Sequence, residues 1–373
     1  MKVLVVDDSA LMRRQIGDIL TRGGCTVTTA RTGAEALVRI AADAPDVVTL
    51  DINMPEMDGL TCLSRIMAEM PRPVVMISSL TEEGALATLE AIALGAVDFM
   101  HKPGGTVSTG LREQEDVIIA KVTAAAGARI RRATGLRQRL AARRDAIMRA
   151  PVQPRARAGG YGPGNEALTL IGASTGGPAV LEEILSALAG DYPMPVLVCQ
   201  HMPASVTRHF AQRLDQCCAM RVEEVRRHTV LEAGTIYLAR GDADMIVQAR
   251  DERLVATMVP SSRAHTWHPS VSRLVESALK TVTADSLIGV QLTGMGDDGA
   301  AELAELKRRG GYTIAESEES CVVYGMPRAL VECGGASEVL PGHAIAARLE
   351  RVAQARIRSL ARATTGGAAS WAC

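Results

Sequence analysis

Short apolar runs alternate with helix-length amphipathic segments along the first part of the chain. The apolar runs are residues 3–6, 26–29, 47–50, 74–77 and 97–99. Between them, apolar residues recur at spacings of three and four, which is typical of helices that pack by one face. Strands that alternate with helices form parallel sheets covered on both faces. The pattern therefore predicts an α/β domain with a five-stranded, doubly wound parallel sheet.

A second alternation of the same kind begins at residue 168. We expect strands at residues 168–171, 195–199, 235–238, 287–292 and 312–315, and helices at residues 179–188, 205–217, 269–280 and 300–309. This pattern predicts a second α/β domain with a mostly parallel sheet. In such sheets, functional groups gather at the carboxyl ends of the strands.

The segment between the two patterns is basic and ends in helix breakers. Residues 128–158 hold ten arginines and a single acid, Asp145, and Pro151 and Pro154 interrupt the helix-forming run. We interpret the arginines as a solvated helix face in preference to a binding patch. The predicted divisions are a first domain at 1–120, an Arg-rich helix and flexible linker at 121–166, a second domain at 167–350 and a tail at 351–373.

Composition narrows the class of protein further. The 373 residues are 47% apolar but only 2% aromatic, so aliphatic side chains must fill both cores. A net charge of −1 argues against a nucleic-acid partner or an acidic lipid surface. The eight cysteines form no Cys-x-x-Cys pair, and no apolar run approaches the roughly 20 residues of a membrane helix. We expect a cytoplasmic protein with reduced thiols and no membrane insertion.

Carboxylates stand at two strand ends of the first domain. Asp7 and Asp8 follow the first strand, and Asp51 ends the third, so the three carboxylates can converge at one edge of the sheet. Hard oxygen ligands in that number suit Mg²⁺, beside which Asp51 can act as a nucleophile toward a phosphoryl group. Ser78 and Lys102 follow two further strands and could hold phosphoryl oxygens.

Each of these residues also has a structural explanation. Asp8 or Ser9 could cap the following helix, Asp51 could open a turn, and Lys102 could be an ordinary surface residue. The occurrence of all these residue types at the expected strand ends favours the phosphorylation switch.

The second domain contains the elements of a serine hydrolase. Ser174 lies in Gly-Ala-Ser-Thr-Gly-Gly between a strand and a helix, which is the form of a nucleophile turn. His201 follows the next strand and can serve as its base, and Asp297 or Asp298 can orient that imidazole. The order Ser, His, Asp differs from the Ser, Asp, His order of α/β-hydrolases, which disfavours a plain lipase or esterase.

The alternatives for these motifs are a phosphate-binding glycine loop and a buried structural imidazole. The loop at 172–177 lacks both the lysine that follows in a P-loop and the full Rossmann spacing. The remaining histidines are taken as surface or packing residues: 101, 209, 228, 265, 268 and 343.

Residues 1–103 resemble a response-regulator receiver domain. The matching residues are Asp7-Asp8, Asp51-x-x-Met54-Pro55-x-Met57-Asp58-Gly59, Ser78 and Lys102-Pro103. The resemblance implies that a chemotaxis histidine kinase donates a phosphoryl group to Asp51. It also implies that Asp7, Asp8, Asp51 and the backbone carbonyl of Asn53 bind Mg²⁺.

Residues 168–340 resemble the catalytic domain of the CheB family of chemotaxis protein-glutamate methylesterases. The matching runs are Ile171 to Gly177, Gln200-His201-Met202-Pro203, Leu292 to Ala300 and Ser320 to Pro327. The resemblance selects Asp298 as the triad acid and implies an oxyanion hole at Met295 and Thr175. It implies demethylation of glutamate methyl esters, and deamidation of glutamines, on chemoreceptor cytoplasmic domains, with no cofactor for the esterase.

The chain departs from that family at several positions outside the proposed triad. Val206 stands where phenylalanine is usual, Asp244 where histidine is usual, and Ser272 where aspartate is usual. These departures bear on receptor recognition and on the shape of the pocket. They are the only support for one rival interpretation, a signalling adaptor without catalysis. A second rival is a receiver fused to a phosphate- or nucleotide-binding output domain that uses the same glycine-rich loop.

Overall fold

The computed structural model describes residues 1–78, 81–102, 111–130 and 166–367. These residues form two compact units, one on each side of residues 131–165, and each unit is described by itself. Most of the predicted Arg-rich linker therefore lies outside the described residues. Among the described residues, no helix combines the length and apolarity that crossing a membrane requires.

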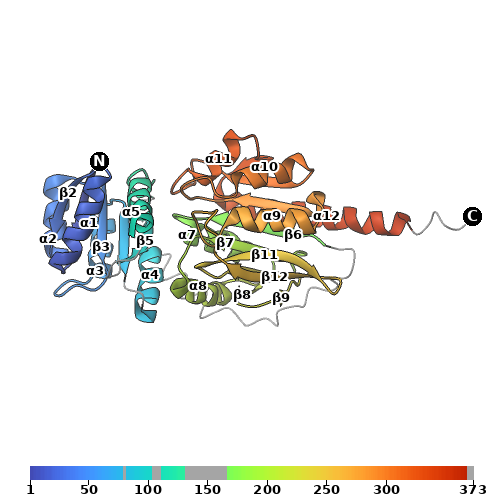
Figure 1. Ribbon diagram of the computed structural model, residues 1–373, viewed down its shortest axis with the longest axis horizontal. Coiled ribbons are helices and arrows are strands. Elements are labelled where there is room, and N and C mark those ends of the chain that lie inside the picture. Colours follow the sequence, from blue (N-terminus) through green and yellow to red (C-terminus); the bar gives the residue numbers. More distant parts are fainter. Residues whose placement is uncertain (79–80, 103–110, 131–165, 368–373) are drawn as a thin grey trace, which may run out of the picture. The chain divides into compact units, whose positions relative to one another are not determined.

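The N-terminal unit is a five-stranded parallel sheet in the order β2-β1-β3-β4-β5 (Figure 1). Its elements are β1 (Lys2–Val6), α1 (Ala10–Arg22), β2 (Thr26–Ala30), α2 (Gly33–Asp43), β3 (Val47–Asp51), α3 (Gly59–Glu69), β4 (Val74–Ser78), α4 (Glu82–Leu94), β5 (Asp98–His101) and α5 (Leu111–Ala126). Helix α1 packs beside α5, whereas α3 packs between α2 and α4, so the sheet is covered on both faces. The predicted doubly wound fold is confirmed.

Local sequence explains where the helices of this unit begin. A short polar side chain at each N-cap accepts a hydrogen bond from a backbone amide three residues on, at Ser9, Thr32, Asp58 and Thr81. Asp8 is therefore not the cap of α1, since Ser9 has that role. The carboxylate of Asp8 stays available at the end of β1.

The C-terminal unit contains a seven-stranded sheet in the order β15-β14-β13-β6-β7-β10-β8, in which every pairing is parallel. The elements of this sheet and its helices are β6 (Leu168–Ala173), α7 (Gly177–Ala187), β7 (Val196–Gln200), α8 (Ala204–Cys217), β8 (Arg221–Val225), β10 (Thr235–Ala239), α9 (Val271–Thr281), η1 (Ala284–Ser286), β13 (Leu287–Gln291), α10 (Ala300–Arg308), β14 (Tyr312–Glu316), α11 (Met326–Glu332), β15 (Glu338–Leu340) and α12 (Gly342–Gly367). The predicted second α/β domain is confirmed.

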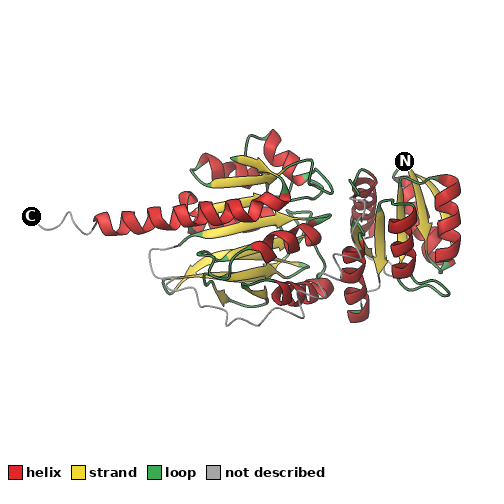
Figure 2. Cartoon of the chain, turned by 180° about the vertical axis from the view of Figure 1, so that it is seen from behind, coloured by secondary structure: helices red, strands yellow, loops and turns green. Residues whose placement is uncertain are grey.

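Helices enclose this sheet on two sides. Helix α7 packs beside α8 and α12, while α10 packs between α9 and α11 (Figures 1 and 2). Helix α12 continues through residues 351–367, which belong to the segment predicted as a tail after the second domain. Strand β6 lies near the middle of the sheet, between β7 and β13, and all its residues are buried. The ends of these three strands position the catalytic candidates.

The apolar pattern did not predict five strands of this unit. Strands β9 (Thr229–Val230), β11 (Ala243–Arg250) and β12 (Arg253–Pro260) form a separate antiparallel sheet, and β11 packs against α9. Strands β8 and β15 lie at the two edges of the main sheet. Strands β8, β11 and β15 carry polar residues at partly exposed positions, so they lack the continuous apolar runs of central strands. Strand β12 is mostly apolar and partly buried, so its sequence did carry a strand signal that the prediction overlooked.

Candidate phosphorylation and catalytic sites

The receiver-like site forms where β1 and β3 end side by side. Because Val6 pairs with Leu50, the next residues along the two strands, Asp7 and Asp51, emerge at the same edge of the sheet. Both are buried, whereas Asp8 is exposed, and the three carboxylates present oxygen atoms within 4.8 Å of one another.

A lysine follows β5 and neutralises part of this charge. Lys102 Nζ lies 2.8 Å from Asp51 Oδ2 and 3.1 Å from Asp7 Oδ2. Burial by itself would lower the pKa of Lys102, but its hydrogen bonds to Asp51 and Asp7 raise it, so the lysine stays charged. Burial and the nearby charge of Asp7 raise the pKa of Asp51, even though Lys102 acts in the opposite direction. The cluster therefore holds excess negative charge.

The donor set at this edge fits a divalent cation. Asp51 Oδ1 is buried and accepts no hydrogen bond from any residue that the structure describes. A hard cation beside Asp7, Asp8 and Asp51 would occupy that lone pair and offset the repulsion between the carboxylates. The backbone amide of Asn53 acts to lower the pKa of Asp51, so Asn53 lies at the same edge.

Ser78 ends β4 next to β3 and is only 2% exposed. Its hydroxyl lies 3.2 Å from the carbonyl oxygen of Gly84, to which it donates, and the backbone amide of Lys102 donates to the carbonyl oxygen of Ser78. The sequence-predicted phosphoryl-binding pair is thus held together at the carboxyl ends of β4 and β5. The structure brings all the predicted receiver residues to one edge of the sheet.

Strand register also assembles the serine hydrolase candidates. Ala173 pairs with Gln200, so Ser174 and His201 are each the next residue beyond neighbouring strands β6 and β7. The amide of His201 donates to the carbonyl oxygen of Ala173 at 3.0 Å, which holds the two strand ends together. Ser174 is 3% exposed and His201 is 6% exposed. The loop after β13 brings Asp298 to the same place.

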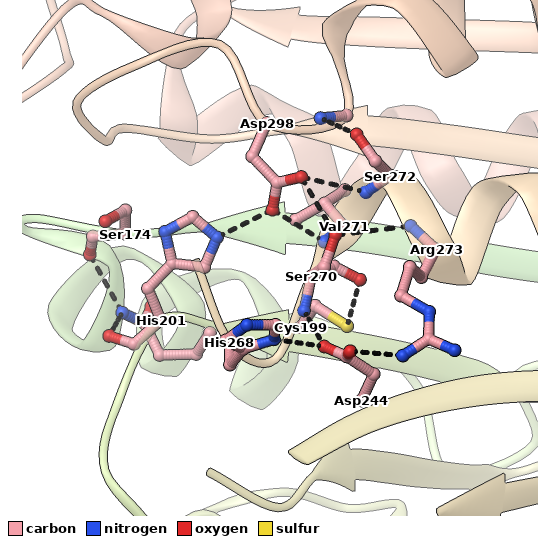
Figure 3. A network of polar contacts seen from close by, with 12 residues as sticks. Ser174, Cys199, His201, Asp244, His268, Ser270, Val271, Ser272, Arg273 and Asp298 are labelled. Atoms are coloured by element: carbon pink, nitrogen blue, oxygen red, sulfur yellow. Dashed lines mark hydrogen bonds and ion pairs between the residues drawn. The ribbon is translucent and has the colours of Figure 1, made fainter. Parts of the chain in front are cut away.

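His201 lies between Ser174 and Asp298 (Figure 3). Its Nε2 atom is 2.8 Å from Asp298 Oδ2, so Nε2 carries the proton and donates it to the carboxylate. Its Nδ1 atom is buried and has no hydrogen-bond partner among the described residues. With Nε2 protonated, Nδ1 retains the lone pair of the neutral imidazole. The geometry therefore leaves Nδ1 as the basic atom.

The N-terminus of helix α9 holds the carboxylate of Asp298. Oδ2 accepts hydrogen bonds from His201 and from the amide of Val271, and Oδ1 accepts from the Ser270 hydroxyl and the Ser272 amide. Burial alone would raise the pKa of Asp298, but the hydrogen bonds from His201, Val271 and Ser272 lower it to about 2. Partial positive charge at a helix start stabilises the same ionised form. Asp298 is thus a fixed anion facing the imidazole.

The structure distinguishes Asp298 from its neighbour Asp297. Asp298 is buried and bonded to His201, whereas Asp297 is exposed. The residues alone left both open, and the resemblance selected Asp298.

Close packing places the proposed oxyanion region beside Ser174. A Cβ atom on Gly294 would lie 2.7 Å from the Cβ of Ser174, so only glycine fits there. This contact brings the next residue, Met295, to the nucleophile. Thr175 follows Ser174 directly, and its carbonyl oxygen accepts a hydrogen bond from Thr293 at 3.0 Å. Both residues proposed for the oxyanion hole therefore adjoin Ser174.

Two glycines of the loop are packed closely against other parts of the protein. A Cβ atom on Gly176 would lie 2.5 Å from Val322, and one on Gly177 would lie 2.1 Å from Oε1 of Gln200. Side chains of Val322 and Gln200 fill the space that the missing Cβ atoms leave, so these two glycines allow close packing of the loop.

Sequence reasoning missed three residues next to the triad. Gln200 donates from Nε2 to the Ser174 carbonyl oxygen at 2.9 Å, and Trp267 stacks on His201 with ring centroids 5.6 Å apart. His268 is bonded to buried Asp244, so its assignment as a default surface or packing residue overlooked a specific partner. The sequence indicated Gln200 only through its position next to His201. The Trp267–His201 and His268–Asp244 contacts arise from tertiary packing, which no local pattern predicts.

A phosphoacceptor-type site and a Ser-His-Asp site on separate α/β units define a response regulator with a serine hydrolase as its output. Family comparisons agree with both halves. The "Response regulator receiver domain" family model matches residues 3–108, and the "CheB methylesterase" family model matches residues 169–349. The chain belongs to the CheB methylesterase family.

The chain is also similar to named relatives over most of its length. It is 54% identical to "Protein-glutamate methylesterase/protein-glutamine glutaminase 3" of Rhodospirillum rubrum over 93% of this chain and 95% of the relative. It is 50% identical to a protein of Rhodopseudomonas palustris named as enzyme 2 of the same type, over 93% and 96% of the two chains. The crystal structure of the Thermotoga maritima CheB methylesterase catalytic domain matches at 34% identity and a TM-score of 0.48, covering 50% of this chain and 98% of that one.

Proposed function

We propose that the chain removes methyl groups from glutamate methyl esters, and the amide nitrogen from certain glutamines, on chemoreceptor cytoplasmic domains. The observation that carries this proposal is the His201 imidazole, bonded through Nε2 to a buried anion and with a lone pair on Nδ1 beside Ser174. This arrangement is the one that turns a weakly nucleophilic hydroxyl into an acyl acceptor. It also argues against an adaptor that has lost catalysis.

The reaction proceeds through an acyl-enzyme. Ser174 Oγ attacks the ester carbonyl carbon as its proton passes to His201 Nδ1. Backbone amides of Thr175 and Met295 stabilise the resulting oxyanion, a contribution of about 3–4 kcal/mol per donor. The intermediate breaks its bond to the methoxy group, which leaves as methanol with the proton from Nδ1.

Water then completes the cycle. His201 Nδ1 takes a proton from a water molecule, whose oxygen attacks the acyl carbon. The ester bond to Ser174 breaks, Ser174 recovers its proton from Nδ1, and the glutamate side chain is released. A glutamine substrate follows the same course with ammonia as the leaving group. Asp298 keeps the imidazole oriented and stabilises its transient positive charge.

We infer that phosphorylation of Asp51 raises this hydrolase activity. A histidine kinase of the chemotaxis system would supply the phosphoryl group. Asp7, Asp8, Asp51 and the carbonyl of Asn53 would hold Mg²⁺, which offsets the charge of the incoming phosphoryl group. Lys102 and Ser78 would then hold the phosphoryl oxygens. The proposed setting is the cytoplasm, where such a kinase and receptor domains are found together.

The decisive experiment is methanol release from methylated receptor membranes, measured with and without a small phosphodonor and Mg²⁺. We expect release that rises with the phosphodonor and disappears in Ser174→Ala. Ser205→Ala, at the start of α8, is a matched control that should keep full activity. No release from the intact protein on several cognate receptors, while Asp51 is demonstrably phosphorylated, would contradict the proposal.

A further inference from the structure

Asp244 is a fully buried carboxylate in the catalytic unit, outside the proposed triad. It lies in β11, and its relative exposure is 0%. Oδ1 accepts hydrogen bonds from His268 Nδ1 and from the Ser270 amide, each at 2.8 Å. Oδ2 accepts from Arg273 Nη1 at 2.6 Å. A buried carboxylate with this many donors is ionised, and removing its charge leaves those donors without a partner.

The charge state follows from these contacts. Burial alone would raise the pKa of Asp244, but the hydrogen bonds from His268, Ser270 and Arg273 lower it below its ordinary value. Asp244 thus holds a permanent negative charge at the turn that leads into α9 (Figure 3).

The residues that Asp244 holds are next to two members of the triad. His268 is preceded by Trp267, whose ring lies on the imidazole of His201 at an interplanar angle of 12°. Ser270 donates its hydroxyl to Asp298 Oδ1 at 3.1 Å. One turn, residues 267–270, therefore contacts both the base and the acid of the triad. Asp244 holds that turn through its hydrogen bonds with His268 and Ser270.

Arg273 links Asp244 to the end of the neighbouring strand. Its Nη1 atom donates both to Asp244 and to the carbonyl oxygen of Pro260, at the end of β12. Asp244 pairs with Val259 in the antiparallel sheet of β11 and β12. The antiparallel sheet, which the apolar pattern did not predict, is thereby tied to the N-terminus of α9.

We propose that Asp244 is a positioning residue for the hydrolase reaction, which acts through the 267–270 turn on His201 and Asp298. Loss of the carboxylate would release Trp267 from the face of His201 and weaken the Ser270 bond to Asp298. The imidazole would then occupy orientations in which Nδ1 no longer faces Ser174. This inference rests on the proposed triad. The inference adds Asp244 to the residues needed for catalysis, although Asp244 contacts no member of the triad directly.

Asp244→Asn tests the proposal because it preserves size and removes the charge. We expect kcat for methanol release to fall about tenfold to a hundredfold, which is the cost of a misplaced catalytic group, while KM changes little. Glu276→Gln is the matched control. Glu276 lies on α9 and its side chain is 55% exposed. Among the residues that the structure describes, it forms an ion pair only with Lys280, at 3.4 Å.

Tryptophan fluorescence supplies a readout that does not depend on activity. The chain has two tryptophans, Trp267 and Trp371, so a Trp371→Phe background reports Trp267 alone. In that background we expect Asp244→Asn to change Trp267 emission, because the indole leaves the face of the imidazole, and to make the emission more sensitive to acrylamide. Glu276→Gln should leave both unchanged.

Two outcomes would overturn the proposal. One is Asp244→Asn with unchanged Trp267 emission and kcat within twofold of the parent, measured well below its melting temperature. The other is Trp267→Ala with kcat equal to that of Trp267→Phe, which decides the question even if Asp244→Asn fails to fold. If the parent protein releases no methanol, the proposed function fails, while the fluorescence comparison still tests the positioning of Trp267.

Discussion

Replacement of Asp298 by asparagine removes one charge and little volume, so its effects can be worked out from the hydrogen bonds. Each carboxylate oxygen of Asp298 accepts two bonds, and one asparagine oxygen can serve only one of the two pairs. If the amide oxygen stays with Ser270 and Ser272, the amide NH₂ faces His201. His201 must then present a lone pair at Nε2 and carry its proton on Nδ1.

That change of tautomer removes the base beside Ser174. We expect kcat to fall about 10⁴-fold, as when the wrong tautomer forms in a serine hydrolase triad. The folded state of the protein also loses stability relative to the unfolded state. The fall of the Asp298 pKa from 3.8 to about 2 corresponds to about 2 kcal/mol, at 1.36 kcal/mol for each pH unit.

The assay is single-turnover and steady-state methanol release, combined with urea unfolding at pH 7. Asp297→Asn is the matched control, because Asp297 is adjacent and exposed. It should keep its rate and its stability. An Asp298→Asn protein that retains more than a tenth of the parent kcat, or an Asp297→Asn protein that loses as much, would refute the assignment of the acid.

Three further outcomes follow from the charges of the two sites. Asp51→Asn should abolish activation by a phosphodonor and leave basal methanol release intact, whereas loss of basal release would contradict the separation of switch and catalysis. Chelation of Mg²⁺ should abolish phosphorylation of Asp51 in the parent, measured as acyl phosphate, without changing basal release. Because the pKa of Asp298 is lower in the folded state, its contribution to stability should be complete above about pH 4 and be lost as pH falls toward 2. Asp298→Asn should show a smaller loss of unfolding free energy over that pH range.

The sequence predicted the elements whose position follows from strand ends. Asp7, Asp51, Ser174 and His201 each stand directly at or after a buried apolar strand, and parallel pairing then brings them together. The alternation of apolar runs sufficed because central strands of a parallel sheet are buried on both faces.

Other features depend on contacts that no local pattern encodes. Strand β11 of the antiparallel sheet mixes polar and apolar positions, which weakens its signal in the sequence, whereas β12 is mostly apolar and was overlooked. The partners of Asp244 lie 24 to 29 residues away in a turn and a helix that local periodicity cannot bring to it. Trp267 reaches His201 only because that turn is held in place. Residues that support a site are therefore harder to predict than residues that form it.

The proposed catalytic site is assembled from segments that lie at unequal distances along the chain. Ser174 and His201 meet through the pairing of β6 with β7, two strands close in sequence, whereas His201 and Asp298 are 97 residues apart and meet only when β13 joins β6. Closing the longer loop costs more chain entropy and slows folding. Recovery of esterase activity during refolding should therefore follow formation of the β6–β13 pair, and lag behind the recovery of helical signal. A polypeptide that ends before β13 would lack the proposed acid of the triad and the strand that pairs with β6.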